Sequence, residues 1–273
     1  MNVDSVGASD KESEKPSSFL LNKNMNRAQT FGEDAQQYDR ARPGYPVALI
    51  DDLLHGDPEV VLDVGSGTGI ASRLLAARGC HVLCVEPDAR MAAVGRIYGL
   101  RVEEASFEKW EPDSRLFDLL ISAQAWHWVD PRLGSAKAAT ALKPDARIAL
   151  FWNVGHLPLK LKGAFEEVYA RISPGFGKDS ILLGNAGERF ETSARALQST
   201  GAFQDVELKF FTESREYTTQ QWVDQFHTHS EYRSLSLKQR LLLLEAIASI
   251  IDDEGGQFIM NYETVLVSGK RIQ

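Results

Sequence analysis

Apolar and polar positions follow two different periods along this chain. Short, nearly continuous apolar runs predict five strands, at residues 60–64, 81–86, 100–103, 117–122 and 147–152. Helical spacing predicts three intervening helices, at residues 70–78, 89–98 and 131–142. Strands that are apolar throughout and separated by helices indicate a parallel sheet covered on both faces. The pattern therefore predicts a doubly wound α/β fold.

The rest of the chain is expected to complete and cover this sheet. Apolar runs at residues 206–211 and 258–268 predict two further strands, and helical spacing recurs at about 162–172 and within 219–253. Residues 1–29 are rich in Ser, Asn, Lys, Glu and Asp. A segment with few apolar side chains cannot offset the conformational entropy that ordering would cost. We therefore expect this segment to be a disordered tail.

A glycine turn follows the first predicted strand, in the stretch EVVLDVGSGTG at residues 59–69. Gly65, Gly67 and Gly69 stand at alternate positions between a strand and a helix, so backbone N–H groups face the carboxyl edge of the sheet, where ligands of open α/β folds bind. The spacing differs from the dinucleotide fingerprint, and Asp63 precedes the first glycine by two residues. A carboxylate there disfavours a phosphate and suits an ammonium group.

A second acid, Glu86, ends the next apolar run, where a carboxylate can meet a ribose diol. The pair Asp63 and Glu86 therefore suits a nucleoside that carries an amine and no pyrophosphate. A turn whose glycines serve packing alone, or an NAD site, is the alternative at this point.

These motifs strongly resemble the class I S-adenosylmethionine-dependent methyltransferases, in the small-molecule branch of type 11. The resemblance runs from about residue 31 to the C-terminus, with its specific motifs between residues 38 and 128. It implies a Rossmann-like, seven-stranded, mostly parallel sheet with the last strand antiparallel, plus helical cap insertions. In that family the D-x-G-x-G-x-G motif cradles the methionine part of the cofactor, and the acid ending the second strand binds both ribose hydroxyls.

The resemblance implies further cofactor contacts. A Y-x-x-x-R-P-x-Y-P segment, here containing Tyr38 and Arg42, lies over the cofactor in the family, while Tyr45 is expected to pin a helix to the sheet. The loop after the third strand contacts adenine, with Ser106 where Asp is usual and with the backbone N–H of Phe107. The expected binding residues for S-adenosyl-L-methionine are Tyr38, Arg42, Asp63, Gly65, Ser66, Gly67, Gly69, Glu86, Pro87, Ser106, Phe107 and Gln124.

The fourth predicted strand ends in SAQAWHW, at residues 122–128, where polar and aromatic side chains should face the ligand crevice. We predict Gln124 and His127 near the reacting centre, with His127 as the base if the nucleophile must lose a proton. A structural role for His127 is equally open. Trp126 and Trp128 are candidates for packing under the next helix, an interpretation that we favour for Trp128.

The domain prediction is a methyltransferase domain at residues 30–273, with insertions at 154–187 and 219–253 forming a substrate cap. Within the second insertion, residues 222–233 are expected to contact substrate, because Arg233 suits a carboxylate.

Composition bounds the partners and the compartment. The net charge of -8 gives no electrostatic reason to bind nucleic acid or an anionic membrane. No apolar run approaches the roughly 20 residues of a membrane span, and no secretory segment is recognisable, so we predict a cytoplasmic protein. We expect a monomer or a homodimer. Cys80 and Cys84 would lie about 13 Å apart on an extended segment, so both should be reduced. No His or Cys cluster predicts a metal.

The predicted function is methyl transfer from S-adenosylmethionine to an O, N or C nucleophile of a small molecule, by in-line displacement. In-line placement and exclusion of water are the main requirements of this chemistry. One alternative is a non-catalytic protein that binds S-adenosylmethionine. The other, an NAD-linked oxidoreductase, is disfavoured by Asp63 and by the glycine spacing.

Overall fold

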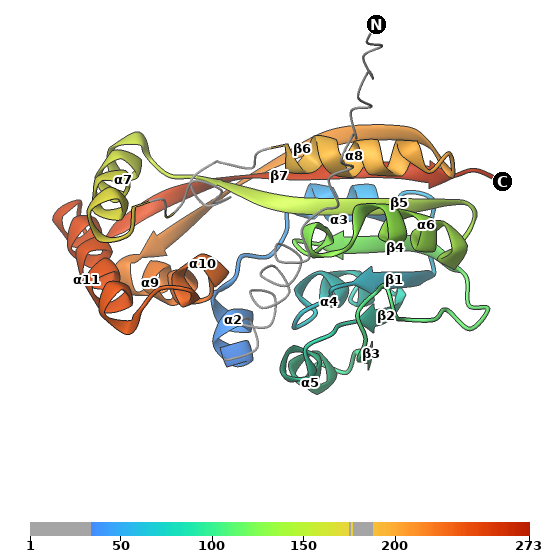
Figure 1. The fold of residues 1–273 in the computed structure, drawn as a ribbon, viewed down its shortest axis with the longest axis horizontal. Helices are drawn as coiled ribbons and strands as arrows, with labels where there is room; N and C mark the ends of the chain where they lie inside the picture. The colour runs from blue at the N-terminus through green and yellow to red at the C-terminus, as the bar shows by residue number, and fades with distance from the viewer. Residues whose placement is uncertain (1–33, 175, 177–187) are drawn as a thin grey trace, which may run out of the picture.

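The computed structural model describes residues 34–174, 176 and 188–273 (Figure 1). The predicted tail at 1–29 therefore lies outside the described residues, as does the end of the predicted insertion at 154–187.

One seven-stranded sheet, in the order β3-β2-β1-β4-β5-β7-β6, runs the length of the molecule (Figure 1). The pairs among β1 to β5 are parallel, whereas β7 is antiparallel to both of its neighbours, β5 and β6. This confirms the predicted doubly wound, seven-stranded sheet with its last strand antiparallel. The strands are β1 Val60–Val64, β2 His81–Val85, β3 Arg101–Glu103, β4 Phe117–Ala123, β5 Leu142–His156, β6 Phe203–Thr218 and β7 Gln257–Arg271.

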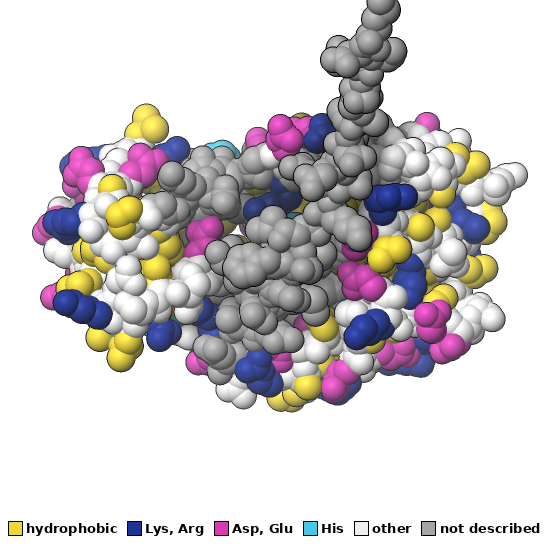
Figure 2. Space-filling model, in the orientation of Figure 1, with side chains coloured by type: hydrophobic (Ala, Val, Ile, Leu, Met, Phe, Trp, Pro, Cys, Tyr) yellow, Lys and Arg dark blue, Asp and Glu magenta, His cyan; other side chains and the backbone are white. Residues whose placement is uncertain are grey.

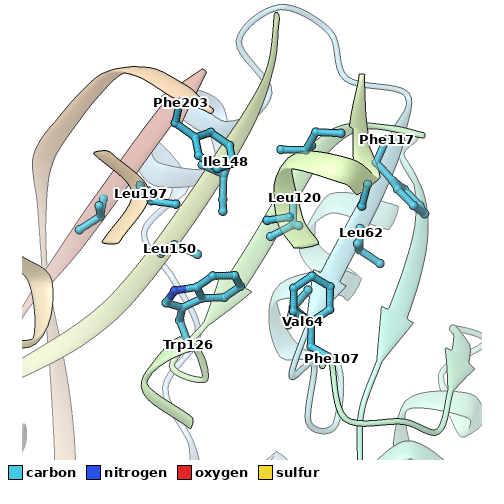
Figure 3. Packing of buried hydrophobic residues seen from close by; sticks show 14 of the residues in the cluster. Leu62, Val64, Phe107, Phe117, Leu120, Trp126, Ile148, Leu150, Leu197 and Phe203 are labelled. Carbon is cyan, nitrogen blue, oxygen red and sulfur yellow. The ribbon is translucent and has the colours of Figure 1, made fainter. Parts of the chain in front are cut away.

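Helices cover both faces of the sheet, because the central strands are apolar on both sides. On one face pack α3 (Val47–Leu53), α4 (Ile70–Ala76) and α5 (Ala89–Ile97). On the other face pack α6 (Pro131–Ala141) and α8 (Arg189–Ser199). Figure 3 shows this second core, in which side chains of β1, β4 and β5 meet Leu197 of α8.

The strands β5 and β6 are 15 and 16 residues long, far longer than the apolar runs predicted at 147–152 and 206–211, and β7, with 15 residues, extends beyond the run at 258–268 at both ends. Their extra length carries the cap, which lies to the left in Figure 1. The cap consists of α7 (Leu159–Ile172), α9 (Thr219–His227), α10 (Ser230–Arg233) and α11 (Leu237–Asp253).

The cap has an apolar core of its own. Trp222 and Phe226 of α9 pack in one cluster with Leu243 and Ile247 of α11 and with side chains of α7 and β7. Only 1% of the surface of Trp222 is exposed, so this aromatic belongs to the cap core rather than to the predicted substrate-contacting surface. Capping boxes at Thr218 and Ser236 start α9 and α11.

Within the described part of the chain, no helix is long and apolar enough to cross a membrane, and no three potential ligands gather where a metal ion could bind. Cys80 and Cys84 are both buried free thiols. On the face shown in Figure 2, Lys and Arg side chains of the described residues are interspersed with Asp and Glu.

Candidate functional site

The glycine turn after β1 can be built only from glycines at two of its positions. Gly65 has a φ of +70°, and a Cβ there would lie 2.5 Å from the Cβ of Ala125. Gly69, the N-cap of α4, has a φ of +84°, and its Cβ would collide with the side chain of Leu100. The absent side chains therefore let the backbone of the turn approach its neighbours, and α4 begins at the turn.

Glu86 is buried at the carboxyl end of β2, 7% exposed, and holds the glycine turn. Its Oε2 accepts the N–H of Gly67 at 2.8 Å, and its Oε1 accepts the N–H of Asp88 at 2.9 Å. Burial raises the pKa of Glu86 to about 7, while the two backbone donors oppose the rise. Each carboxylate oxygen keeps a lone pair for a further donor. Pro87, the neighbouring predicted contact, is exposed.

Asp63 is fully buried within β1. Its Oδ2 accepts a hydrogen bond of 2.6 Å from Ser72 Oγ, which also lies 3.1 Å from Cys84 Sγ. Burial is the main reason that the pKa of Asp63 rises to about 7; the Ser72 bond opposes the rise, and the charge of Glu86 adds to it. The two predicted carboxylates therefore stand in one low-dielectric region on either side of the turn.

Three polar atoms near the turn are shielded from solvent and have no hydrogen-bond partner in the described structure: Asp63 Oδ1, Ser66 Oγ and Thr68 Oγ1. A buried polar atom without a partner costs about 1–3 kcal/mol. Such atoms gathered at a strand-to-helix turn are typical of a binding site, and their acceptor and hydroxyl chemistry fits the amine and hydroxyl groups of S-adenosylmethionine. Ser66 and Asp63 thus both place an unpartnered polar atom at the turn, and their roles in binding stay predictions.

Gln124 lies directly beyond β4 in a strained conformation. Its φ is +61°, in the left-handed region that residues other than glycine rarely adopt. Its backbone N–H donates to Phe151 O at 2.8 Å, which ties the residue after β4 to the interior of the longer neighbouring strand β5. Strain of this kind is concentrated at binding and catalytic sites, so the geometry supports Gln124 as a candidate.

His127 lies in the 3-10 helix Trp126–Trp128 and accepts a hydrogen bond at Nδ1 from Trp152 Nε1, at 3.3 Å. An indole N–H only donates, so Nδ1 carries no proton in this arrangement, and the neutral ring holds its proton on Nε2. In this tautomer Nε2 carries the N–H donor of His127, and the ring lone pair at Nδ1 accepts from Trp152. This geometry favours an orienting role, and the role of general base stays a prediction.

Of the two tryptophans around His127, the preference for Trp128 as the packing residue is wrong. Trp126 is 2% exposed and lies in the core beneath α6, where Gly134 of that helix makes room for its ring, whereas Trp128 is partly exposed. The packing role therefore belongs more to Trp126 than to Trp128.

The predicted adenine loop is only partly available to a ligand. The ring of Phe107 is 3% exposed and packs between Trp110 and Trp126, with ring centroids 6.0 and 5.9 Å away. Its side chain is therefore a core group, and a contact through its backbone N–H stays a prediction. Ser106 is partly buried, and its carbonyl accepts from the N–H groups of Lys109 and Trp110.

Tyr38 and Arg42 belong to the short helix α2 (Ala35–Ala41) and the residue after it. Tyr38 packs against Met91 and Val94 of α5, and the Arg42 guanidinium lies 4.9 Å from the centre of its ring. The same guanidinium donates to Thr228 Oγ1 and O of the cap, at 2.9 and 3.0 Å. Tyr45 packs edge-on against Phe151, in agreement with its predicted packing role.

Sequence reasoning missed Ser72 and Trp152, the partners of Asp63 and His127. A signal for Ser72 exists, because a buried carboxylate needs a donor and Ser72 stands in the first turn of the helix that follows the glycines. Nothing in the sequence pairs Trp152 with His127, because that contact joins β5 to a loop 25 residues earlier.

Comparisons with known proteins point to methyltransferases. Residues 62–150 match the family described as methyltransferase domain. An uncharacterized methyltransferase of Mycobacterium tuberculosis is 37% identical over 129 residues, which cover 45% of this chain and 52% of that protein. The chain thus spans about half the length of this curated relative.

Solved structures share the fold. A candidate type II methyltransferase from Anaeromyxobacter dehalogenans aligns with a TM-score of 0.62 at 18% identity, covering 85% of this chain and 98% of that one. The phosphoethanolamine N-methyltransferase 2 of Haemonchus contortus aligns with a TM-score of 0.53 at 18% identity, covering 93% of this chain and 60% of that one.

Fold and site together define a Rossmann-like methyltransferase domain. The match over residues 62–150, the methyltransferase relatives and the shared fold support a class I S-adenosylmethionine-dependent methyltransferase. These similarities favour a methyltransferase over the NAD-linked alternative.

Proposed function

We propose that this protein transfers a methyl group from S-adenosylmethionine to a small-molecule acceptor. One observation carries the proposal: Asp63 and Glu86 are buried on either side of a glycine turn, with Glu86 bonded to the N–H of Gly67 and Asp63 keeping an unpartnered oxygen. Burial raises the pKa of each carboxyl group to about 7 and so disfavours its charged form; a cation bound nearby would favour the charged form again. The cofactor carries that cation as an amine and a sulfonium.

In this proposal Glu86 accepts hydrogen bonds from both ribose hydroxyls through its remaining lone pairs. Asp63, Ser66 and the turn hold the amino-acid part. Ser106 and the backbone of Phe107 face the adenine, with Pro87 beside Glu86. The bound Haemonchus contortus enzyme has been solved with S-adenosylmethionine, and also with S-adenosylhomocysteine and phosphomonomethylethanolamine, which supports both a cofactor and a small acceptor of this class.

When bound, S-adenosylmethionine supplies an electrophilic methyl carbon. The residues of this chain then have to orient the acceptor and exclude water, which contribute most of the acceleration in such reactions. Gln124 and His127 stand beyond β4 and are proposed to orient the acceptor, His127 by donating from Nε2. The cap, including residues 219–253, is proposed to close over the crevice. An acceptor that is already anionic needs no base.

The proposed location rests on the two cysteines, Cys80 and Cys84. Two buried free thiols fit a reducing compartment, and we propose a cytoplasmic protein. A monomer or a homodimer satisfies the proposal equally.

Titration calorimetry tests the cofactor. We expect S-adenosylhomocysteine and S-adenosylmethionine to bind and NAD not to bind. Glu86→Gln should weaken binding by about 1–3 kcal/mol, because it removes one acceptor and the charge. Asp51→Asn is the matched control, since Asp51 is an exposed acid in a surface ion pair with Arg78. Binding of NAD alone, or unchanged affinity in Glu86→Gln, would refute the site.

Turnover is tested separately, by following release of S-adenosylhomocysteine in the presence of metabolite acids, phenols and amines. Methylation of one class identifies the acceptor. Tight cofactor binding without methylation of any class would favour the non-catalytic alternative.

A further inference from the structure

The helix α2 lies between the cap and the part of the molecule that carries the glycine turn, made of β1 to β4 with α4 and α5, which we call the cofactor lobe (Figure 1). It has only seven residues, Ala35–Ala41, and a helix of that length is not stable by itself. Its position is therefore set by the groups that it contacts. Those groups lie on both lobes: Asp39 contacts the lobe that carries the glycine turn, and Arg42 contacts the cap.

On the cofactor side, Asp39 forms a two-pronged ion pair with Arg73 of α4. Its Oδ1 lies 2.6 Å from Arg73 Nη2 and its Oδ2 lies 3.3 Å from Arg73 Nη1. The hydroxyl of Tyr98 donates to the same Oδ2 at 2.8 Å. The side chain of Asp39 is only 7% exposed, so solvent weakens this pair less than it weakens an ordinary surface pair.

Arg73 in turn contacts the glycine turn. Its Nε donates to the carbonyl of Gly69 at 3.3 Å, and its backbone N–H donates to the same carbonyl at 2.9 Å. The guanidinium also lies 3.9 Å from the centre of the Tyr98 ring. The guanidinium of Arg73 therefore joins Gly69 to the carboxylate of Asp39. A change in the position of Asp39 should move the guanidinium and, through it, the backbone of Gly69.

On the cap side, Arg42 donates from Nε to Thr228 Oγ1 at 2.9 Å and from Nη2 to Thr228 O at 3.0 Å. Its Nη2 also lies 3.4 Å from His229 Nδ1. Thr228 is fully buried at the C-terminal end of α9, and its hydroxyl donates to Gln225 O at 2.6 Å. The contact therefore fixes α2 to the end of a cap helix and not to a mobile surface group.

We propose that α2 couples the cap to the cofactor turn, with Asp39 as the positioning residue for Gly69. The inference rests on the proposed function, because it takes the turn to be the cofactor site. Asp39 lies in α2, and Arg42 directly follows the helix with its N–H donating to Tyr38 O at 3.0 Å, so a shift of α2 moves both groups together. A cofactor that holds the turn in one position then favours one position of the cap, and the reverse follows by linkage.

The first test compares Asp39→Asn with Asp51→Asn by calorimetric titration of the full chain with S-adenosylhomocysteine. Both replaced acids pair with an arginine of α4 or the turn after it, but Asp51 and Arg78 are 60% and 42% exposed and do not contact the glycines. We expect Asp39→Asn to weaken binding about fivefold or more, Asp51→Asn to leave it unchanged, and Asp39→Glu to restore part of the affinity. Equal affinities of wild type and Asp39→Asn would overturn the proposal.

The second test is a double-mutant cycle with Thr228→Val, which removes the cap hydroxyl without touching the turn. If α2 transmits the effect, Thr228→Val weakens S-adenosylhomocysteine binding in the wild type and has little effect in the Asp39→Asn background. A purely structural role for the two residues gives additive losses, and additive losses would overturn the coupling.

Hydrogen exchange without ligand separates this inference from the proposed function. Asp39→Asn should speed amide exchange at residues 225–229 of the cap as well as around Gly69, and Asp51→Asn should not. If the wild-type protein binds no S-adenosylhomocysteine, the proposed function fails. The exchange comparison needs no ligand, so it still shows whether α2 couples the cap to the glycine turn. Exchange in the cap that is unchanged by Asp39→Asn would contradict it.

Discussion

Asp63→Asn should make the free protein more stable at alkaline pH while weakening its hold on the cofactor. Asp63 is fully buried, with one hydrogen bond from Ser72 Oγ and one oxygen that has no partner in the described structure. An asparagine keeps an oxygen that can accept from Ser72 and removes the charge. Asp63→Asn therefore removes the free-energy cost of burying a charged carboxylate in a low-dielectric site.

The size of the gain follows from the pKa. Burial raises the pKa of Asp63 from 3.8 to about 7, so between these values the folded protein binds a proton that the unfolded chain has released. Stability therefore falls as pH rises from about 4 to about 7. The shift corresponds to at most about 4 kcal/mol. Local relaxation lowers that ceiling, and we expect a gain of about 1–3 kcal/mol for Asp63→Asn at pH 8 and little gain at pH 4.

Urea unfolding of wild type and Asp63→Asn at pH 4, 6 and 8 measures this directly. The difference in the free energy of unfolding should grow with pH and level off above about pH 7, where the wild-type carboxylate is ionised. Because the charge of Glu86 contributes to the raised pKa of Asp63, the same comparison in a Glu86→Gln background isolates Asp63. A difference that does not change with pH, or a less stable variant at pH 8, would refute the argument from burial.

The same variant should lose cofactor affinity at pH 8, by about 1–3 kcal/mol for S-adenosylhomocysteine, because a cationic amine loses its carboxylate partner. Calorimetric titration measures this loss. Higher stability combined with unchanged affinity would mean that Asp63 does not face the ligand.

Other perturbations test other parts of the site. Gly65→Ala should lower the free energy of unfolding in urea by more than about 2 kcal/mol, because the added methyl meets the Cβ of Ala125. Gly79→Ala is the control. Gly79 has a φ of +96° and open space around it, so this variant should show only the cost of the backbone conformation, about 1 kcal/mol. Trp152→Phe should remove the donor to His127, so nitrogen NMR should report the Nε2–H tautomer in wild type and a mixture in the variant; the same spectrum in both would contradict the assigned hydrogen bond.

The sequence was sufficient for the central sheet because those strands are buried on both faces. The stretch at 60–64 was predicted as it stands in the structure, since four of its five residues are apolar and four are buried. The strand predicted at 206–211 runs from Phe203 to Thr218 instead. This is an edge strand, and most of its residues are exposed, so polar side chains interrupt the apolar pattern over much of its length.

The two carboxylates of the site could be predicted because their chemistry follows from local position, each at a strand end beside the glycine turn. Their partners could not be predicted. Asp39 and Arg73 are 34 residues apart, and Arg42 and Thr228 are 186 residues apart, so which polar groups meet depends on how the lobes pack. For the same reason the choice between Trp126 and Trp128 was wrong, because packing against α6 decides it.

The cap is joined to the cofactor lobe in two physically different ways. The strands β5, β6 and β7 run through both lobes, and their paired backbones give a stiff connection whose hydrogen bonds do not include the glycine turn. The contacts of α2 give a second connection, made of oriented polar side chains, which reaches Gly69 through Arg73. A ligand on the turn acts directly on the second connection. The charge on Asp39, and not the length of the shared strands, should therefore determine how strongly cofactor and cap respond to each other.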